Sequence, residues 1–207
     1  MTERLTRRER QERTRCRLLE AAGRVFARRG LANASVDEVA ADAGFTKGAV
    51  YANFGSKEEL FLAMLDGRFA ERLAEMDRAL STDEPPEQQA RTAARDFVDY
   101  LKGDPEWEQL FFEAGLHASR NPRFREQLTA PYAAMRERMA EILRARLESA
   151  GIDPGVPFDQ LAMMIFAMGN GVAFERLVEP GAVPDDLFST MLEIFTLGAQ
   201  SRQPRPS

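Results

Sequence analysis

Residues that start or stop helices recur along this sequence at intervals of about one helix length. No segment shows the alternation of apolar and polar residues that is typical of a strand. Two capping boxes and two cap–proline pairs are present: Ser35 with Glu38, Ser56 with Glu59, Asp104-Pro105 and Asn121-Pro122. A capping box satisfies the free N–H groups at the start of a helix, and proline is favoured at the first helical position. Because β-branched alternation is almost absent, the chain is predicted to be all-α.

About nine helices are expected. Their approximate ranges are 10–29, 35–43, 46–54, 56–80, 86–102, 105–119, 122–150, 158–177 and 185–200. Gly30 and Gly44 are expected to end the first two helices. Pro131 is expected to kink or split the seventh helix, and the tail after residue 200 is expected to be frayed.

Composition excludes several classes of protein. With 44% hydrophobic and 29% charged residues, the chain can bury a core and is not expected to be disordered. The longest strongly apolar stretch, 161–169, is shorter than the roughly 20 residues of a spanning helix, so no membrane association is expected. The N-terminus lacks the apolar run of a signal peptide, which indicates a cytoplasmic protein. With one cysteine and one histidine, no internal disulfide, metal site or cofactor is expected.

Charge divides the chain into a basic head and an acidic body. Residues 1–57 hold 12 Lys and Arg against 7 Asp and Glu, whereas residues 58–207 hold 16 against 26. The head is predicted to meet a polyanion, although an arginine-rich solvated helix face would show the same balance. We therefore expect a domain over 1–57 with a basic N-terminal arm, and a second helical domain over 58–207.

Two short helices joined through Gly44 have the spacing of a helix-turn-helix, whose second helix can lie in the major groove of DNA. Apolar side chains would pack this pair on the first helix: Val36, Val39, Ala40, Val50 and Phe54. The remaining side chains of the second helix would face outward: Thr46, Lys47, Gly48, Tyr51 and Asn53. Many helix–helix corners with this spacing bind nothing, so the spacing alone is weak support.

The run from Thr14 to Phe61 resembles the DNA-binding region of the TetR (tetracycline-repressor) family. The matching positions are Ala21-Ala22, Phe26, Gly30, Val39-Ala40, Ala43-Gly44, Lys47-Gly48, Tyr51, Phe54 and Lys57-Glu58. Asn53 departs from the family, which more often has His or Tyr there. The resemblance implies an N-terminal three-helix DNA-binding domain and a C-terminal domain for ligand binding and dimerisation.

The resemblance also implies which residues meet double-stranded operator DNA. Base and backbone contacts are implied for Ser35, Thr46, Lys47, Gly48, Tyr51, Asn53 and Lys57. Ser35 and Thr46 could instead serve only as caps, and Tyr51 could pack on the first helix. Lys47 and Lys57 show no evident structural task in the sequence, which favours binding. Non-specific phosphate contacts are expected from the arm: Arg7, Arg8, Arg10, Arg13 and Arg15.

The last two helices are candidates for a homodimer interface. The segment 161–174 is apolar nearly all round and must be covered on both sides. Ala167 and Gly171, four residues apart, would allow another helix to approach closely. The apolar face of the final helix would be Leu187, Met191, Ile194, Phe195 and Gly198. Burial of the same helices within a monomer is the alternative, and the family resemblance favours the dimer.

A small-molecule effector, apolar or amphipathic, is the expected ligand of the body. Candidate ligand-binding residues are Tyr100, Trp107, Phe111, Glu113, His117, Met163, Phe166 and Asn170. Aromatic and methionine side chains suit apolar sites, but such residues are more often plain core. Glu113 and His117 could instead satisfy each other or face solvent, and Asn170 could bond across the dimer interface.

The sequence thus predicts a ligand-responsive transcriptional regulator, a homodimeric repressor that a small molecule releases from a palindromic operator. An activator of the same fold is one alternative. An enzyme is disfavoured because no phosphate loop, dinucleotide fingerprint or metal cluster is present. A helical adaptor that has lost DNA binding is the other alternative, and the intact basic head disfavours it.

Overall fold

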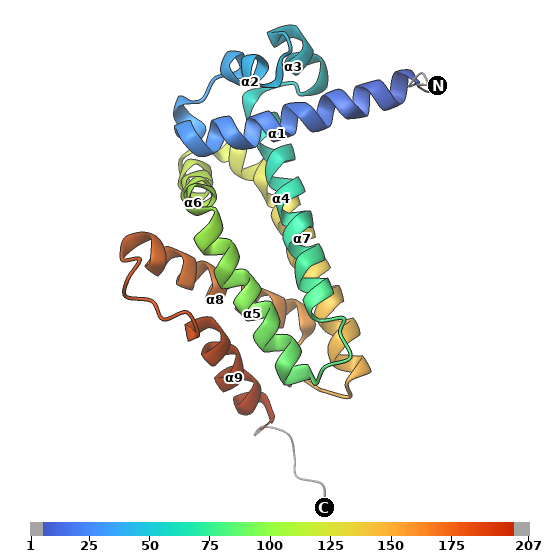
Figure 1. Cartoon of the computed structure of the whole chain (residues 1–207), viewed down its shortest axis with the longest axis vertical. Helices are drawn as coiled ribbons and strands as arrows, with labels where there is room; N and C mark the ends of the chain where they lie inside the picture. The colour runs from blue at the N-terminus through green and yellow to red at the C-terminus, as the bar shows by residue number, and fades with distance from the viewer. Residues whose placement is uncertain (1–5, 201–207) are drawn as a thin grey trace, which may run out of the picture. The chain divides into compact units, whose positions relative to one another are not determined.

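The computed structural model describes the backbone of residues 6–200 and the side chains of residues 6–194, and this range contains helices and no strand (Figure 1). The helices are α1 (Arg7–Asn33), α2 (Val36–Ala43), α3 (Lys47–Asn53), α4 (Lys57–Ala79), α5 (Pro86–Gly103), α6 (Pro105–Arg120), α7 (Pro122–Ser149), α8 (Phe158–Val178) and α9 (Leu187–Gln200). The all-α prediction is confirmed. Phe195 and Gly198, which were predicted to belong to the apolar face of the final helix, lie outside the residues whose side chains are described.

Local capping explains where the early helices begin. The Ser35 hydroxyl accepts from the Glu38 N–H at 3.2 Å, and the Glu38 carboxylate accepts from the Ser35 N–H at 3.0 Å. This is the capping box that the sequence predicts for α2. A capping box that was not predicted joins Thr6 and Glu9 at the start of α1. The helix therefore begins three residues earlier than expected.

The first helix does not stop cleanly at Gly30. Gly30 has φ 75° and ψ 162°, outside the helical region, and a short helical turn continues beyond it to Asn33. A residue with a side chain adopts positive φ only at a cost, which glycine avoids. The prediction of an end at Gly30 located the break but missed the turn that follows.

The seventh helix runs through Pro131 without being split. Proline removes one backbone hydrogen bond and crowds the preceding turn. Leu128 and Met135, buried on either side of Pro131, anchor the helix in its surroundings. Packing on both sides offsets the lost hydrogen bond, so α7 is not split, and a kink at Pro131 stays a prediction.

Contacts divide the chain into two compact units. Unit 1 combines residues up to Arg68 with Gln109–Pro131, and unit 2 combines Phe69–Glu108 with the residues from Tyr132 onward. In unit 1, Phe61 lies 5.4 Å from Phe26 and 6.1 Å from Phe124 between ring centroids. The linear division at residues 57 and 58 stays a prediction.

Unit 2 has a core of its own. One cluster joins α7 to α8 through Ala140, Leu143, Leu161 and Ala162. Elsewhere in the unit, the rings of Phe97 in α5 and Phe188 in α9 lie 4.9 Å apart. These contacts join α7 to the next helix, α8, and join α5 to α9, which lies far along the sequence.

Among the described residues, α8 is the one helix long and apolar enough to cross a membrane, with a mean hydropathy of 1.4 in its most apolar window. The sequence expectation stopped at Gly169, but the apolar run continues past Asn170 and Gly171 without a charge until Glu175. The uncharged run from Leu161 to Phe174 is still shorter than roughly 20 residues, so the absence of membrane association stays a prediction. A core helix of a soluble protein meets the same criteria.

Candidate functional site

The second helix of the helix-turn-helix, α3, exposes the side chains that the sequence predicts on its outer face. Thr46, Lys47, Gly48 and Tyr51 are exposed, and Tyr51 leaves 47% of its surface open. Val50, on the opposite face, is buried at 1% exposure. The predicted contact residues of α3 therefore share one open surface, and Tyr51 is not packed away in the core.

Two of these predicted contact positions also cap helices. The Thr46 hydroxyl accepts from the Ala49 N–H at 3.2 Å, and Ser35 caps α2 as described above. The Asn53 side-chain amide, half-buried, donates to the carbonyl of Ala49 at 2.8 Å. Capping does not prevent a hydroxyl from contacting DNA, so these contacts stay predictions.

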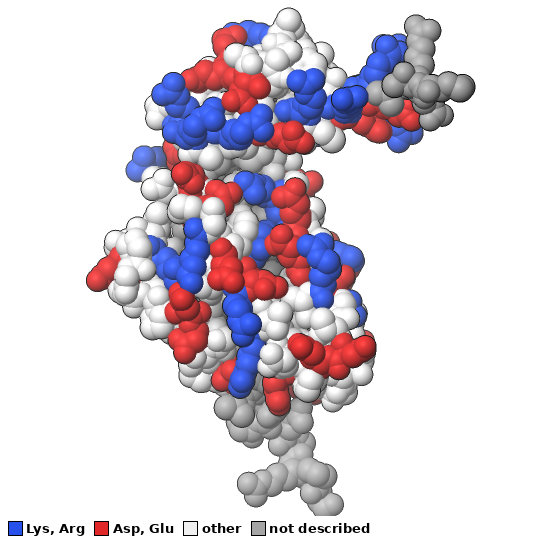
Figure 2. Space-filling model, viewed as in Figure 1, with Lys and Arg blue, Asp and Glu red and all other residues white. Residues whose placement is uncertain are grey.

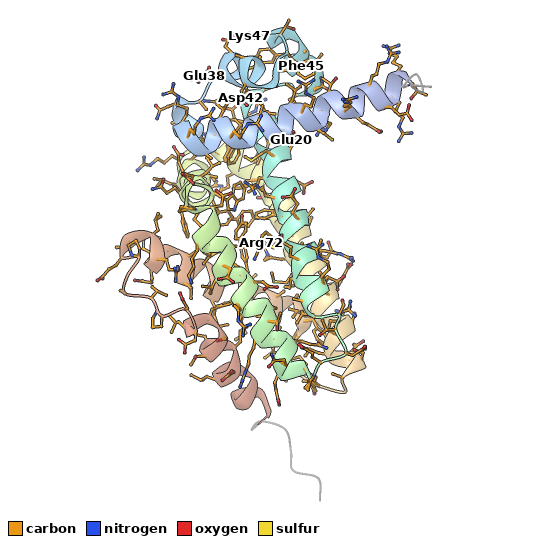
Figure 3. All side chains as sticks on the ribbon, in the orientation of Figure 1. Glu20, Glu38, Asp42, Phe45, Lys47 and Arg72 are labelled. Carbon is orange, nitrogen blue, oxygen red and sulfur yellow. The ribbon has the colours of Figure 1, made fainter. Side chains whose placement is uncertain are left out.

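Lys47 is paired with a carboxylate. Its ammonium donates to Asp37 at 2.8 Å, and the two side chains are 54% and 62% exposed. This hydrogen bond and the charge of Asp37 raise the pKa of Lys47 above its ordinary value. Lys47 is labelled at the outer edge of the helix-turn-helix in Figure 3.

Lys57 has a structural task that the sequence did not reveal. Its ammonium donates to the backbone carbonyls of Leu31, Ala32 and Ala34 at 2.8, 3.2 and 3.1 Å. These carbonyls belong to the last turn of α1 and its end, where backbone acceptors lack helical partners. The premise that Lys57 lacks a structural role is therefore wrong, and its phosphate contact stays a prediction.

Arginines of α1 hold α2 in place through ion pairs. Arg24 and Arg28 donate to the two carboxylate oxygens of Asp42 at 2.7 and 3.2 Å, and Arg29 donates to Glu38 at 3.1 Å. Figure 2 shows the arginines of α1 in blue, and Figure 3 labels both acidic partners. Part of the basic charge of the head is thus already neutralised within it.

Two more arginines of α1 contact the ends of α2 and α3. Arg17 donates to the Ala43 carbonyl at 2.9 Å, and its guanidinium lies 4.8 Å from the centre of the Phe45 ring. Arg15 donates to the Asn53 carbonyl at 3.2 Å. Arg15 was expected to contact phosphate, and in the structure it also supports the end of α3.

Glu113 and His117, proposed as ligand contacts, lie in unit 1 and do not pair with each other. The Glu113 carboxylate accepts from the Leu31 N–H of α1 at 2.9 Å. The His117 ring lies 3.4 Å from the Asn121 amide and packs against Phe124 at 4.8 Å between centroids. Glu113 therefore joins α6 to the end of α1, a role the sequence did not predict.

The other candidate ligand residues are divided between the units. Phe111 belongs to unit 1, and Tyr100, Trp107, Met163, Phe166 and Asn170 belong to unit 2. Trp107 is buried at 5% exposure, as a core residue would be, whereas Met163 is 54% exposed on α8. The eight candidates thus belong to both units, and their ligand contacts stay predictions.

Unit 2 holds two aromatic groups that include the predicted ligand residues Tyr100 and Phe166, whereas their partners Arg72, Phe69 and Tyr132 were not predicted. The guanidinium of Arg72 in α4, labelled in Figure 3, lies 3.9 Å from the centre of the Tyr100 ring. Phe69, Tyr132 and Phe166 form a chain of edge-on contacts at 5.6 and 5.7 Å. The available signal was an arginine three residues after Phe69 on the same helix.

Two titratable groups of unit 2 are shifted by burial. Desolvation raises the pKa of Glu108 to about 7, an effect opposed by Arg72 and reinforced by Asp104. Desolvation also raises the pKa of Tyr132 to about 12. Both groups are therefore biased toward their neutral forms. Among the described residues, no group of three or more His, Cys, Asp or Glu could hold a metal ion.

The open apolar and small residues of α8 form one stripe: Met163, Met164, Ala167, Gly171, Phe174 and Val178. The exposed polar residues of α8, which are Asp159, Gln160 and Glu175, lie nearer its two ends. The opposite side packs into unit 2 through Leu161, Ala162, Val172 and Ala173. The stripe is apolar with two small residues at its centre, which is the pattern predicted for close helix approach.

Two family profiles together match most of the chain. Residues 18–64 match the family described as bacterial regulatory proteins, tetR family, and residues 85–196 match BetI-type transcriptional repressor, C-terminal. The HTH-type transcriptional repressor SCO4008 of Streptomyces coelicolor is 32% identical over 165 residues, covering 77% of this chain and 78% of the relative.

One more relative and one solved structure are also similar to this chain. The HTH-type transcriptional activator FasR of Mycolicibacterium smegmatis is 38% identical over 96 residues, covering 46% of this chain and 44% of that protein. The transcriptional regulator FadR from Bacillus subtilis, solved in complex with stearoyl-CoA, shares the fold with a TM-score of 0.71 and 18% identity. That comparison covers 88% of this chain and 98% of the other.

Proposed function

The chain belongs to the TetR family of DNA-binding transcriptional regulators, which are not enzymes, and from this premise we propose that it is a homodimeric, ligand-responsive repressor of a palindromic operator. The observation that carries the proposal is the open face of α3, where Thr46, Lys47, Gly48 and Tyr51 stand together. Its place of action is the cytoplasm, where bacterial DNA lies.

Each residue of this face has a chemistry suited to DNA. Lys47 can donate to guanine or to phosphate, and Tyr51 and Asn53 can donate to phosphate. Gly48 lies in a helix, where alanine is intrinsically more stable. A Cβ at Gly48 would find no atom nearer than 3.8 Å, so the protein itself does not require glycine there. Close approach of the DNA backbone supplies a reason for it.

Dimerisation is supported by the apolar stripe of α8. A single recognition helix reads few base pairs, whereas a two-fold dimer places two of them about 34–36 Å apart, one turn of DNA. Met163 and Phe174 remain 54% and 49% exposed in one chain. A second copy packing across Ala167 and Gly171 would remove this apolar surface from water.

The effector is proposed to be a small apolar or amphipathic molecule that binds in unit 2. Support comes from the aromatic chain of Phe69, Tyr132 and Phe166 and from the half-buried Arg72. Helices α4, α6 and α7 each begin in one unit and end in the other, so a ligand against them can influence both. About 1.4 kcal/mol of preference for the non-binding state weakens operator affinity tenfold.

Selection of genomic fragments by the purified protein, followed by footprinting, tests the proposal. We expect a palindromic footprint that weakens steeply with salt. Lys47→Ala and Gly48→Ala should weaken operator binding at least tenfold while the protein stays folded. Gly67→Ala is the matched control, because Gly67 is another exposed helical glycine with no atom within 4 Å of its Cβ position. A folded dimer that enriches no DNA at low salt would overturn DNA binding.

Activation of transcription is the second candidate, because FasR, a relative over 96 residues, is an activator. A repressor is expected to protect DNA that overlaps the promoter and to reduce transcription in vitro. Protection upstream of the promoter with increased transcription would favour the activator.

A further inference from the structure

The recognition helix carries little charge of its own. Lys47 is the single charged residue in the segment from Ala43 to Gly55. Its ammonium lies 2.8 Å from the Asp37 carboxylate of α2, so this charge is paired within the free protein. Electrostatic attraction of α3 to arbitrary phosphates is correspondingly reduced.

The position of this pair is unusual for a lysine. Lys47 is the first residue of α3, where the helix dipole disfavours a positive charge, whereas Asp37 in the first turn of α2 is favoured by it. Glu38 and Asp42, the other acidic residues of α2, pair with arginines of α1. Asp37 is therefore the acidic residue of α2 that is paired with the recognition helix.

We propose that Asp37 determines operator specificity by restraining Lys47. The restrained lysine then contributes to the affinity for operator DNA and contributes little to the affinity for arbitrary DNA. The inference rests on the proposed binding of DNA through α3. An ammonium has three donors, of which Asp37 takes one, and the others stay available to a base edge or phosphate in front of α3.

The two kinds of complex use the lysine differently. Binding to arbitrary DNA is mostly electrostatic and favours side chains that are free to follow phosphates. Binding to the operator requires a donor held at one position against a base edge. The Asp37 carboxylate opposes binding to arbitrary DNA through its negative charge, and it assists binding to the operator by holding the Lys47 ammonium in place. An exposed ion pair of this kind is weak, so the expected effects are modest.

Asp37→Asn tests the inference, because it keeps the size of the side chain and removes its charge. Affinity for non-operator DNA should rise about two- to fivefold at low salt, with a salt slope steeper by about one. Operator affinity should change less, so the ratio of the two falls. Asp99→Asn, an exposed residue of α5 in unit 2, removes the same charge elsewhere and should leave both affinities unchanged. Circular dichroism checks that both variants are folded.

A double-mutant cycle on non-operator DNA separates restraint of Lys47 from simple repulsion by Asp37. In a Lys47→Ala background, Asp37→Asn should have little effect, because the restrained group is gone. The inference would be overturned if Asp37→Asn raised the affinity for non-operator DNA equally with and without Lys47. It would also be overturned if Asp37→Asn left the ratio of operator to non-operator affinity unchanged. Either outcome leaves DNA binding itself standing. Absence of a footprint with the wild-type protein would instead overturn the proposed function.

Discussion

The short turn that follows the break in α1 is held by two charged side chains from other helices of unit 1. Glu113 of α6 accepts from the Leu31 N–H, and Lys57 of α4 donates to the carbonyls of Leu31, Ala32 and Ala34. Backbone groups at a helix end otherwise rely on caps or water. Charge-assisted bonds are about twice as strong as neutral ones, so both side chains are expected to stabilise unit 1.

Lys57→Met should lower the free energy of unfolding by about 1–3 kcal/mol, because it removes the ammonium and leaves part-buried carbonyls without that donor. Urea unfolding followed by circular dichroism measures the change. Lys47→Met is the matched control, since Lys47 makes one exposed ion pair whose loss should cost less than about 1 kcal/mol. Equal losses in the two variants would contradict a structural role for Lys57.

The sequence could indicate that Lys57 and Glu113 are important but not what they contact. Lys57 was predicted at a helix N-terminus and Glu113 on an apolar helix. Their partners lie 26 and 82 residues away along the chain, on the turn after Gly30. No local spacing encodes such a contact, because it depends on how α1, α4 and α6 pack.

Three glycines of the first three helices differ in what they would tolerate. Gly30 has φ 75°, and a Cβ there would lie 2.7 Å from a carboxylate oxygen of Glu113. Gly44 has φ 72°, with its nearest neighbour, Arg17, at 3.6 Å. Gly48 has ordinary helical backbone and open space around it. These positions thus differ both in backbone conformation and in the atoms that a new side chain would contact.

Alanine substitution at these glycines should produce a defined order of stabilities. Gly48→Ala should stabilise by about 0.5–1 kcal/mol, because glycine is unfavourable inside a helix. Gly44→Ala should destabilise by about 1–2 kcal/mol through its left-handed backbone alone. Gly30→Ala should destabilise more, since the new methyl group also displaces Glu113 from the Leu31 N–H. Thermal unfolding measures all three, and equal losses at Gly30 and Gly44 would contradict this order of stabilities.

Helices were the part of the structure that the sequence predicted best, because their ends depend on neighbours a few residues away. The capping box of Ser35 and Glu38 and the cap at Thr46 form as expected. The start of α1, the turn after Gly30 and the continuity of α7 through Pro131 are exceptions. A rule based on the local backbone predicts disruption at Pro131, but packing of α7 on both sides keeps the helix continuous.

For the chain as a whole, Glu108 makes stability depend on pH. Burial raises its pKa to about 7, so the folded protein retains a proton that an unfolded chain has already released. This contribution is greatest below the ordinary pKa of a glutamate and is lost as pH rises through about 7. Glu108→Gln should therefore stabilise the protein relative to wild type at about pH 8 and have little effect at about pH 4. Urea unfolding at the two pH values tests this, and the same difference at both would contradict it.

The apolar stripe of α8 leads to a prediction about assembly. Phe174→Glu should convert the proposed dimer to a monomer, because it places a charge in the surface that a second copy would cover. Leu116→Glu is the matched control, since Leu116 is a similarly exposed apolar residue of α6 in unit 1. Light scattering after size-exclusion chromatography measures the mass in solution. A wild-type monomer, or a Phe174→Glu dimer, would remove α8 as the interface.

The helices and the helix-turn-helix could be predicted from the amino-acid sequence, because capping and periodicity act between residues close together in the chain. The family followed from the resemblance of the run from Thr14 to Phe61. The sequence also placed Thr46, Lys47, Gly48 and Tyr51 on the outer face of α3, since helical geometry follows from spacing. The pairing of Lys47 with Asp37, the contacts of Lys57 and Glu113, and the contact of Arg72 with Tyr100 were decided only by the tertiary structure. Each depends on which helix faces meet, and that is set by burial of apolar surface over the whole chain.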